Sequence, residues 1–473
     1  MIKNSDQIFA LWQQEQIYLQ SVKEKHPELF VKKPEIEETD TLSRVGISMP
    51  FIDRPLGYLK HHPFDFIVEE IQKNGDVSTV DYAPFTAEPV GDEQRTIYAD
   101  LVKVGVSTVD AVKELCRGLS IEERQVGIAG IKDATALTSQ RVSIRGVSIE
   151  SLSGAQFASL FLKNIHADKG AINIGDLLGN RFTLFIRTEQ GINQDDLMDK
   201  INDLGKNGFW NFYWLQRFGN RLLSHWWGLL LFQGNYKEVV RSYMCDPGPR
   251  ELPAIAFARQ EAGNDFGNWE KMKNILSPFC YSLRHELILL EYLSKNPNNF
   301  LGALKLIPEQ IKLWTYAYAS YLFNRFLSTY ATNHGSYTAK LPLILSPDQR
   351  DRQLYQPFLA ADRIPKQFEQ NIRPFNFIRF ARREVKTRVI PIIHGVKILS
   401  EGIIISFDLE KGAYATTFLA HLFTLVSGLP VPEWVKTKEY DLKETLGTGS
   451  LKETKEKLKK YIIEKETGEE SSE

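Results

Sequence analysis

The stretch GIAGIKDATALTSQRVSI, residues 127–144, sets a Lys-Asp pair between glycines and a strand-like run. Gly127 and Gly130 permit a close backbone approach or a positive φ just before Lys132 and Asp133. The run that follows would hold the pair rigidly at the entrance of a strand. At such a turn Asp133 could act as a nucleophile or a general base. Glycine followed by aspartate is also an ordinary turn, so local chemistry alone leaves both interpretations open.

Around this stretch, strand-like runs alternate with a helical pattern. Strands are predicted at residues 64–71 (FDFIVEEI), 141–144 (RVSI) and 181–187 (RFTLFIR). A helix is expected to begin at Ser107 or Thr108, because either side chain can cap the apolar periodic segment that follows.

Farther along, the pattern becomes helical and then returns to strands. Helical sequence follows Asn220, and its clearest segment is residues 311–330. Strand-like runs reappear at residues 389–393 (VIPII) and 402–409 (GIIISFDL). Strands, a helical block and strands again predict a helical domain inserted into a β-rich core.

The composition fits a soluble protein of more than one packed unit. The chain has 473 residues, 43% of them hydrophobic and 25% charged, with a formal net charge of -1. It has neither an apolar run long enough to cross a bilayer nor a signal-peptide pattern at its start. Cys116, Cys245 and Cys280 are isolated, so neither a zinc knuckle nor a disulfide framework is indicated. A cytoplasmic location is expected.

A basic stretch stands out against this near-neutral total. Between Asn371 and Arg388 lie Arg373, Arg379, Arg382, Arg383, Lys386 and Arg388, opposed by Glu384 alone. A basic cleft can attract phosphate while acidic surface elsewhere balances it, but a solvated protein face gives the same pattern.

Six short motifs follow one another between residues 55 and 430. They are Lys60–Glu70 (KHHPFDFIVEE), Gly130–Gln140 (GIKDATALTSQ), Gly175–Phe182 (GDLLGNRF), Asn211–Gly219 (NFYWLQRFG), Ala317–Asn324 (AYASYLFN) and Gly412–Thr416 (GAYAT). In content and order they resemble the motifs of the TruD family of tRNA pseudouridine synthases. Trp210 and Trp214 depart from the family's usual Pro and Gly, and we expect these two indoles to fill core.

The resemblance implies an α+β fold. A pseudouridine-synthase catalytic core with a mixed or antiparallel sheet would carry an inserted, mainly helical α/β TRUD domain. The expected segments are an N-terminal extension (1–50), the catalytic domain (51–220), the inserted domain (221–374), a catalytic return segment (375–437) and a charged C-terminal tail (438–473). Within the tail, residues 451–466 could form a solvated helix, and residues 467–473 are expected to be disordered.

The resemblance also implies the site. Asp133 would be the catalytic carboxylate, and Lys60 is the expected cation that keeps it ionised. Lys132, adjacent in sequence, would point to the opposite face if the chain is extended there. The residues expected to contact the substrate are Phe182, which could stack on an extruded base, Asn180, Lys132, Phe66, Gln140 and Arg217. Arg217 and the basic stretch are candidates for phosphate contacts.

The implied activity is isomerisation of a specific uridine in tRNA, uridine 13, to pseudouridine. An isomerisation of this kind requires no nucleotide, redox cofactor or metal, which agrees with the absence of a Walker loop, a dinucleotide fingerprint and clustered metal ligands. The expected partner is tRNA or another structured RNA. The alternatives are a non-catalytic RNA-binding protein or RNA chaperone of the same fold, and a glycosidase that releases free base.

Overall fold

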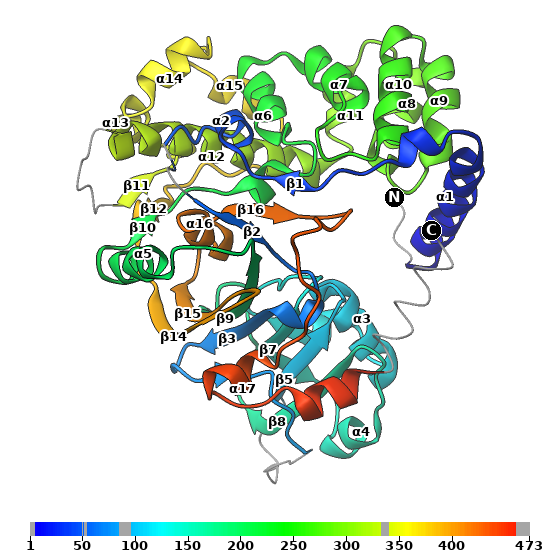
Figure 1. Cartoon of the computed structure of the whole chain (residues 1–473). Coiled ribbons are helices and arrows are strands. Elements are labelled where there is room, and N and C mark those ends of the chain that lie inside the picture. The colour runs from blue at the N-terminus through cyan, green and yellow to red at the C-terminus, as the bar shows by residue number, and fades with distance from the viewer. Residues whose placement is uncertain (1–4, 50, 52–53, 85–95, 333–339, 460–473) are drawn as a thin grey trace. The chain divides into compact units, whose positions relative to one another are not determined.

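The chain forms two compact units, each built from separated segments of sequence. The structure, a computed structural model, describes residues 5–49, 51, 54–84, 96–332 and 340–459 (Figure 1). Residues 1–52 and 210–388 make up the first, helical unit, and residues 53–209 and 389–471 make up the second, β-rich unit.

A mixed β-sheet organises the second unit. Its strands run in the order β16-β2-β9-β3-β7-β5-β8, with β15 also paired to β9 and β14 paired to β15. These strands are β2 (Leu56–Tyr58), β3 (Phe66–Gln72), β5 (Thr96–Val104), β7 (Leu137–Arg145), β8 (Leu160–Asp168), β9 (Leu177–Thr188), β14 (Ile392–Leu399), β15 (Gly402–Glu410) and β16 (Thr424–Ser427). The neighbours β3–β7 and β16–β2 are parallel, whereas the other pairs on this path are antiparallel. Strands predicted at 64–71, 141–144, 181–187 and 402–409 are therefore confirmed in β3, β7, β9 and β15.

Short strands and helices complete this unit. They are β4 (Val77–Ser78), β6 (Val126–Ile128), α3 (Thr108–Leu119), α4 (Ile149–Gly154), α5 (Gln194–Asn207), α16 (Ala415–Ala420) and α17 (Leu442–Leu446). Helix α3 begins as expected, because the Ser107 hydroxyl caps it by accepting a hydrogen bond from the Asp110 amide at 3.1 Å. The run predicted as one strand at 389–393 is divided between β13 (Arg388–Val389) and the start of β14.

The segment expected to be a charged, solvated tail instead forms part of the core. Leu442, Leu451 and Leu458 are buried with Ile67 of β3 and Leu137 of β7 in one hydrophobic cluster. Residues 452–459 are helical, so the expected helix is present over that range, but one side of it is buried. The prediction of full solvation was wrong because leucines spaced among lysines and glutamates make this segment amphipathic. The residues expected to be disordered, 467–473, lie outside the described part of the chain.

A buried ion pair fixes the same segment to the sheet. Lys443 Nζ lies 2.9 Å from Glu69 Oε1 and 2.6 Å from Asp81 Oδ2. Thr454 adds a hydrogen bond of 2.9 Å from its hydroxyl to the carbonyl of Val80. Lys443, from the second segment of this unit, therefore pairs with two carboxylates from its first segment.

The first unit is mainly helical. Its helices are α1 (Ser5–Lys25), α2 (Thr39–Arg44), α6 (Ser224–Gln233), α7 (Tyr236–Cys245), α8 (Pro253–Asn264), α9 (Trp269–Leu276), α10 (Arg284–Lys295), α11 (Phe300–Leu304), α12 (Pro308–Thr332), α13 (Gln349–Gln353), α14 (Gln356–Ala361) and α15 (Glu369–Ile372). Two short strands that are far apart in sequence, β11 (Lys340–Pro342) and β12 (Glu384–Lys386), pair antiparallel. The helix predicted at 311–330 is confirmed within α12.

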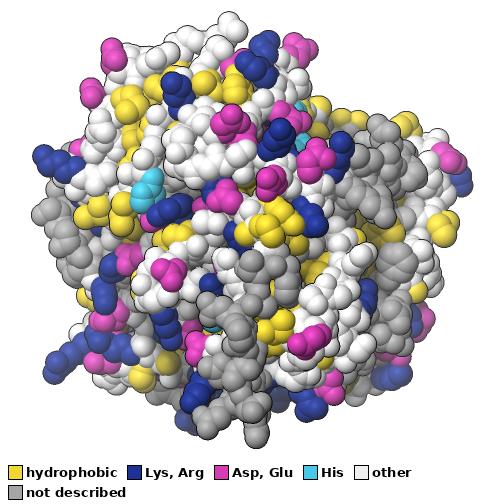
Figure 2. All heavy atoms as spheres, turned by 90° about the horizontal axis from the view of Figure 1, so that it is seen from below, with side chains coloured by type: hydrophobic (Ala, Val, Ile, Leu, Met, Phe, Trp, Pro, Cys, Tyr) yellow, Lys and Arg dark blue, Asp and Glu magenta, His cyan; other side chains and the backbone are white. Residues whose placement is uncertain are grey.

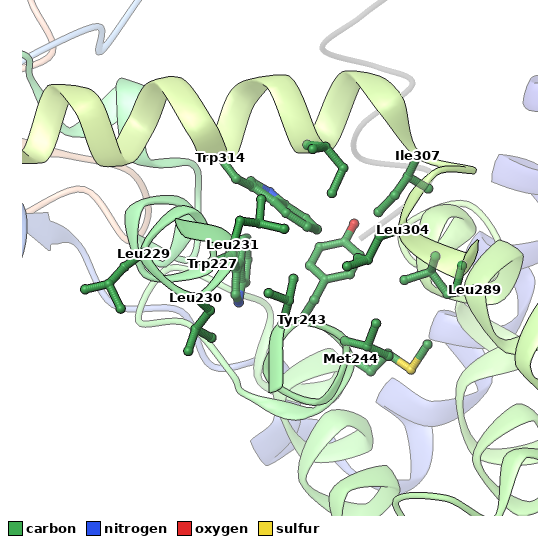
Figure 3. Close-up of a cluster of buried hydrophobic side chains, with 14 of the residues drawn as sticks. Trp227, Leu229, Leu230, Leu231, Tyr243, Met244, Leu289, Leu304, Ile307 and Trp314 are labelled. Atoms are coloured by element: carbon green, nitrogen blue, oxygen red, sulfur yellow. The ribbon is translucent and has the colours of Figure 1, made fainter. Parts of the chain in front are cut away.

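Aromatic side chains form the centre of the helical unit. Figure 3 shows Trp314 of α12 beside Trp227 of α6 and Tyr243 of α7, and the ring centroids of Trp314 lie 5.1 and 4.7 Å from theirs. Gly228 allows α6 to approach α12 closely, because a Cβ there would lie 2.2 Å from the carbonyl oxygen of Trp314. The same unit buries Trp210 and Trp214, so both indoles fill core as expected.

The division into units differs from the expected segments at several places. The chain enters the helical block at Trp210, earlier than the expected residue 221, and residues 438–459 belong to the β-rich unit rather than to a separate tail. The expected N-terminal extension, residues 1–50, clusters with the helical block instead of standing apart. The chain also leaves that block at Arg388, later than the expected residue 374. The expected division into functional domains stays a prediction.

The face of the molecule drawn in Figure 2 carries mixed charge. Figure 2 shows Lys and Arg side chains interspersed with Asp and Glu on the face seen from below, so neither sign dominates that face. None of the helices in the described ranges is long and apolar enough to cross a membrane.

The buried position of Leu451 leads to a stability prediction. Leu451→Ala should lower the free energy of unfolding by about 2–5 kcal/mol, because it opens a cavity behind the sheet. The neighbouring exposed change Lys452→Ala should stay within about 0.5 kcal/mol of wild type. Urea unfolding followed by circular dichroism measures both, and equal stability of the two variants would show that the segment is a solvated tail.

Candidate active site

The site residues of the β-rich unit share one face of its sheet. Phe182 lies opposite Val68, and Asn180 lies opposite Glu70, in the antiparallel pairing of β9 with β3. Alternate residues of a strand point to the same side, so Phe66, Val68 and Glu70 line one face. The parallel pairing of Val68 with Thr138 places Gln140 of β7 on that face as well.

Beside Phe66 of this face, Lys60 and Asp133 form an ion pair. The Lys60 ammonium donates to Asp133 Oδ2, and its Nζ also lies 4.6 Å from the centroid of the Phe66 ring. The two side chains are 25% and 30% exposed, so a substrate can reach them. The pairing expected from the sequence is present, whereas its catalytic role stays a prediction.

The loop that carries Lys60 is held in an unusual conformation. Lys60 has a φ of +60°, a left-handed geometry that residues with a Cβ rarely adopt. Farther along the loop, Asp65 accepts hydrogen bonds from the buried Arg187 guanidinium at 2.9 and 3.2 Å. Arg187 also donates to the carbonyl of Lys438 at 2.9 Å. A buried Arg–Asp pair therefore connects the Lys60 loop to β9 and to the C-terminal segment.

Asp133 is kept ionised by its neighbours. Burial by itself would raise its pKa, but the Lys60 cation and hydrogen bonds from Thr135 more than offset burial and hold the pKa of Asp133 below its ordinary value. Thr135 donates to Asp133 Oδ1 through its amide at 2.9 Å and its hydroxyl at 3.0 Å. The ionised form of Asp133 is therefore favoured at neutral pH.

Lys132 forms an ion pair with Glu70 that is separate from the Lys60–Asp133 pair. Its Nζ lies 2.6 Å from Glu70 Oε2 and donates to Asn180 Oδ1 at 2.7 Å. Burial lowers the pKa of Lys132 and raises that of Glu70, and their mutual attraction offsets part of both effects. Adjacent residues of the turn therefore bind different partners. Contact of Lys132 or Asn180 with substrate stays a prediction.

Gln140 holds the turn at residues 130–132 through hydrogen bonds. It is fully buried, and its Nε2 donates to the carbonyl of Gly130 at 3.0 Å. Its Oε1 accepts a hydrogen bond from the Thr108 hydroxyl at 3.1 Å, and that hydroxyl accepts one from the Lys132 amide at 2.9 Å. The structure thus gives Gln140 a role in shaping residues 130–132, and direct contact with substrate stays a prediction.

Three aromatic rings pack beside the ion pair. Phe182 stacks on Phe407 of β15 with ring centroids 5.5 Å apart and an interplanar angle of 24°. Phe66 meets Phe182 edge to face, with centroids 6.4 Å apart. Phe182 is 9% exposed, so one face of its ring is already covered by protein. Its expected stacking on a base stays a prediction.

Arg217 and the basic stretch belong to the helical unit. The Arg217 guanidinium lies 5.2 Å from the centroid of the Tyr213 ring. Within the stretch, Arg382 pairs with Asp351 at 2.9 Å, and Arg383 and Arg388 lie over the rings of Tyr316 and Trp210. Part of this positive charge therefore stabilises the unit itself.

Sequence reasoning missed several residues that the site depends on. Glu70 was seen only as part of a motif, Thr108 only as a possible helix cap, and Lys103 and Phe407 not at all. The alternation of β3 could have identified Glu70, since it shares a face with Phe66. Within the described residues, no three His, Cys, Asp or Glu side chains gather closely enough to hold a metal ion.

Known proteins with similar sequences or structures are named tRNA pseudouridine synthases. The family profile described as tRNA pseudouridine synthase D (TruD) matches residues 52–343. The chain is 33% identical over 230 residues to a protein of Methanopyrus kandleri named probable tRNA pseudouridine synthase D, covering 48% of this chain and 56% of that one. It is 31% identical over 278 residues to tRNA pseudouridine synthase D of Geobacter sulfurreducens, covering 58% of this chain and 62% of that one. The matched region thus spans less than two thirds of the length of these relatives.

A solved structure shows the same fold. The crystal structure of the putative tRNA pseudouridine synthase D of Methanosarcina mazei superposes with a TM-score of 0.64 and 21% identity, covering 80% of this chain and 97% of that one. The α+β fold expected from the sequence is therefore confirmed. With the family profile matching more than half of its length, the chain belongs to the TruD family of tRNA pseudouridine synthases.

Proposed function

We propose that the protein is a cytoplasmic tRNA pseudouridine synthase that isomerises one uridine, uridine 13, in tRNA. The observation that carries this proposal is the partly exposed Lys60–Asp133 ion pair on the sheet face of a TruD-family chain. An ionised carboxylate reachable from solvent, next to an aromatic surface, suits chemistry on a nucleoside.

The reaction defines what the site must supply. The bond between the ribose C1′ and uracil N1 breaks, the base turns, and C1′ joins C5. The proton on C5 is lost and N1 gains one, so the product is an isomer of the substrate. Asp133 can add to the sugar or base, or can remove a ribose proton to give a glycal. Both routes require the carboxylate to be ionised, and the Lys60 cation favours that state.

The surrounding residues divide the remaining tasks. A uridine in folded RNA must leave its stack before it can react. Phe66 and Phe182 offer an apolar surface for the extruded base, and the nearby Asn180 amide can order the loop or bind the edge of the base. Arg217 and the basic stretch would contact phosphates.

Two other functions would produce different products. A non-catalytic RNA-binding protein or RNA chaperone of this fold would bind tRNA and leave every uridine unchanged. A glycosidase would release free uracil. The ionised, solvent-reachable Asp133 favours an enzyme over a chaperone, since RNA binding alone has no need of a carboxylate there.

Asp133→Asn tests the proposal directly. The amide has nearly the shape of the carboxylate but cannot act as nucleophile or base, so pseudouridine formation should fall below roughly one-thousandth of the wild-type rate. RNA affinity should stay within about threefold, because phosphate contacts are spread over many residues. Mapping pseudouridine in an unmodified tRNA transcript measures the first quantity, and filter binding measures the second.

Asp195 of α5 is exposed, so Asp195→Asn serves as the control. This variant should form pseudouridine at the wild-type rate. Appreciable turnover by pure Asp133→Asn would remove Asp133 from the mechanism. Free uracil among the products would favour the glycosidase.

Lys60→Met probes the charge that keeps Asp133 ionised. Methionine keeps the apolar stem and deletes the ammonium, so the main offset to burial is lost and the pKa of Asp133 rises. The single-turnover rate at pH 7 should fall on the order of 10²-fold. The acidic limb of the pH–rate profile should also move to higher pH, because the carboxylate ionises later. Rates measured against pH at saturating RNA give both quantities.

Lys73→Met provides a matched control for Lys60→Met. Lys73 also pairs with an aspartate, but its partner is Asp176, at 2.5 Å, and the Lys73 side chain is 65% exposed. This control should keep the wild-type rate and profile. If Lys60→Met kept the profile and lost only RNA affinity, Lys60 would be a phosphate contact.

A further inference from the structure

Lys103, near the end of β5, is a buried lysine beneath the catalytic turn. Its side chain is completely shielded from solvent, at 0% exposure, so it cannot touch RNA while the unit is folded. Its Nζ donates to the backbone carbonyl of Asp133 at 2.8 Å and to that of Val106 at 2.6 Å. One ammonium therefore joins β5, the loop that precedes α3, and residue Asp133 itself.

An interior lysine of this kind costs free energy to keep charged. Burial lowers the pKa of Lys103 to about 8, and the neighbouring charges act in opposite directions, Asp133 favouring the ammonium and Lys132 opposing it. At neutral pH most molecules still carry the charge. An apolar side chain would fill the same space without this cost. What the lysine adds is its two hydrogen bonds to main-chain carbonyls.

The other anchors of the turn hold the residues before Asp133. Gln140 binds the carbonyl of Gly130, and Thr108 binds the amide of Lys132. Among these anchors, Lys103 is the one that reaches the main chain of Asp133. Because the carboxylate must meet both Lys60 and the target ribose, a small shift of this main chain would misalign it.

We infer that Lys103 is a positioning residue, which fixes the main chain of Asp133 so that its carboxylate stays aligned with Lys60 and with the reacting nucleoside. The inference rests on the proposed function for its activity readout. It goes beyond that function by assigning a role to a side chain that never contacts the substrate. The anchor acts through two neutral carbonyl acceptors, so its removal should loosen the turn without disturbing RNA-binding surfaces.

Lys103→Met tests the inference, and Lys163→Met is its matched control. Lys163 of β8 is also buried in the same sheet, and it also donates to a main-chain carbonyl, that of Asp81 at 2.5 Å, and to the Thr79 hydroxyl at 2.8 Å. Both variants lose one buried ammonium, so both should lose global stability, but only one loses the anchor of Asp133.

Three quantities distinguish positioning from general destabilisation. In Lys103→Met the single-turnover rate at saturating tRNA should fall about 10²-fold, while the Kd for tRNA stays within about twofold. Amide hydrogen exchange of the peptide covering residues 130–136 should become about tenfold faster. Lys163→Met should keep the rate within about threefold and leave exchange of that peptide unchanged.

Lys103→Gln provides a second test of the inference in case Lys103→Met does not fold. Glutamine retains an N–H donor, so its rate should lie between those of wild type and Lys103→Met. A folded variant of either kind with the wild-type rate and wild-type exchange overturns the inference, as does an equal loss of rate in Lys163→Met. A wild-type protein that forms no pseudouridine overturns the proposed function instead, and exchange of residues 130–136 still tests the anchor.

Discussion

The ion pair between Lys60 and Asp133 is the interaction on which the rest of the site depends. It joins two loops that are 73 positions apart in sequence, and it leaves both groups open to solvent. Burial by itself would make this partly exposed carboxylate ionise less readily, and the Lys60 cation reverses that tendency. Lys60 has a left-handed backbone, and the buried Arg187–Asp65 pair fixes the segment that follows it.

Beneath this pair, buried polar and charged groups support residues 130–133. Glu70 with Lys132, Gln140 with Thr108, and Lys103 each hold a different atom of residues 130–133. On the opposite side of the sheet, the C-terminal segment covers β3 and β7 through Leu442 and Leu451. Buried polar networks are costly when incomplete, so the turn is held by a set of contacts that must all be present together.

Much of this arrangement could be predicted from the sequence. The alternation of residues 64–71 predicted β3, and the strand-like run at 181–187 predicted β9. The resemblance to the family implied the pairing of Lys60 with Asp133. The buried Lys103 could not be predicted, because a lysine in a strand is usually exposed and its burial depends on partners distant in sequence. The prediction that the C-terminal segment is a solvated tail failed for a related reason. Its leucines are sparse among charges, and they become core only because β3 and β7 present an uncovered apolar face.

The most direct test of the account is a map of pseudouridine in cellular tRNA with and without the gene for this protein. The account predicts that one pseudouridine, at uridine 13, disappears from tRNA when the gene is deleted. Expression of the wild-type protein should restore it, and expression of Asp133→Asn at the same level should not. A tRNA pseudouridine pattern that is unchanged by the deletion, or restored equally by Asp133→Asn, would contradict the account.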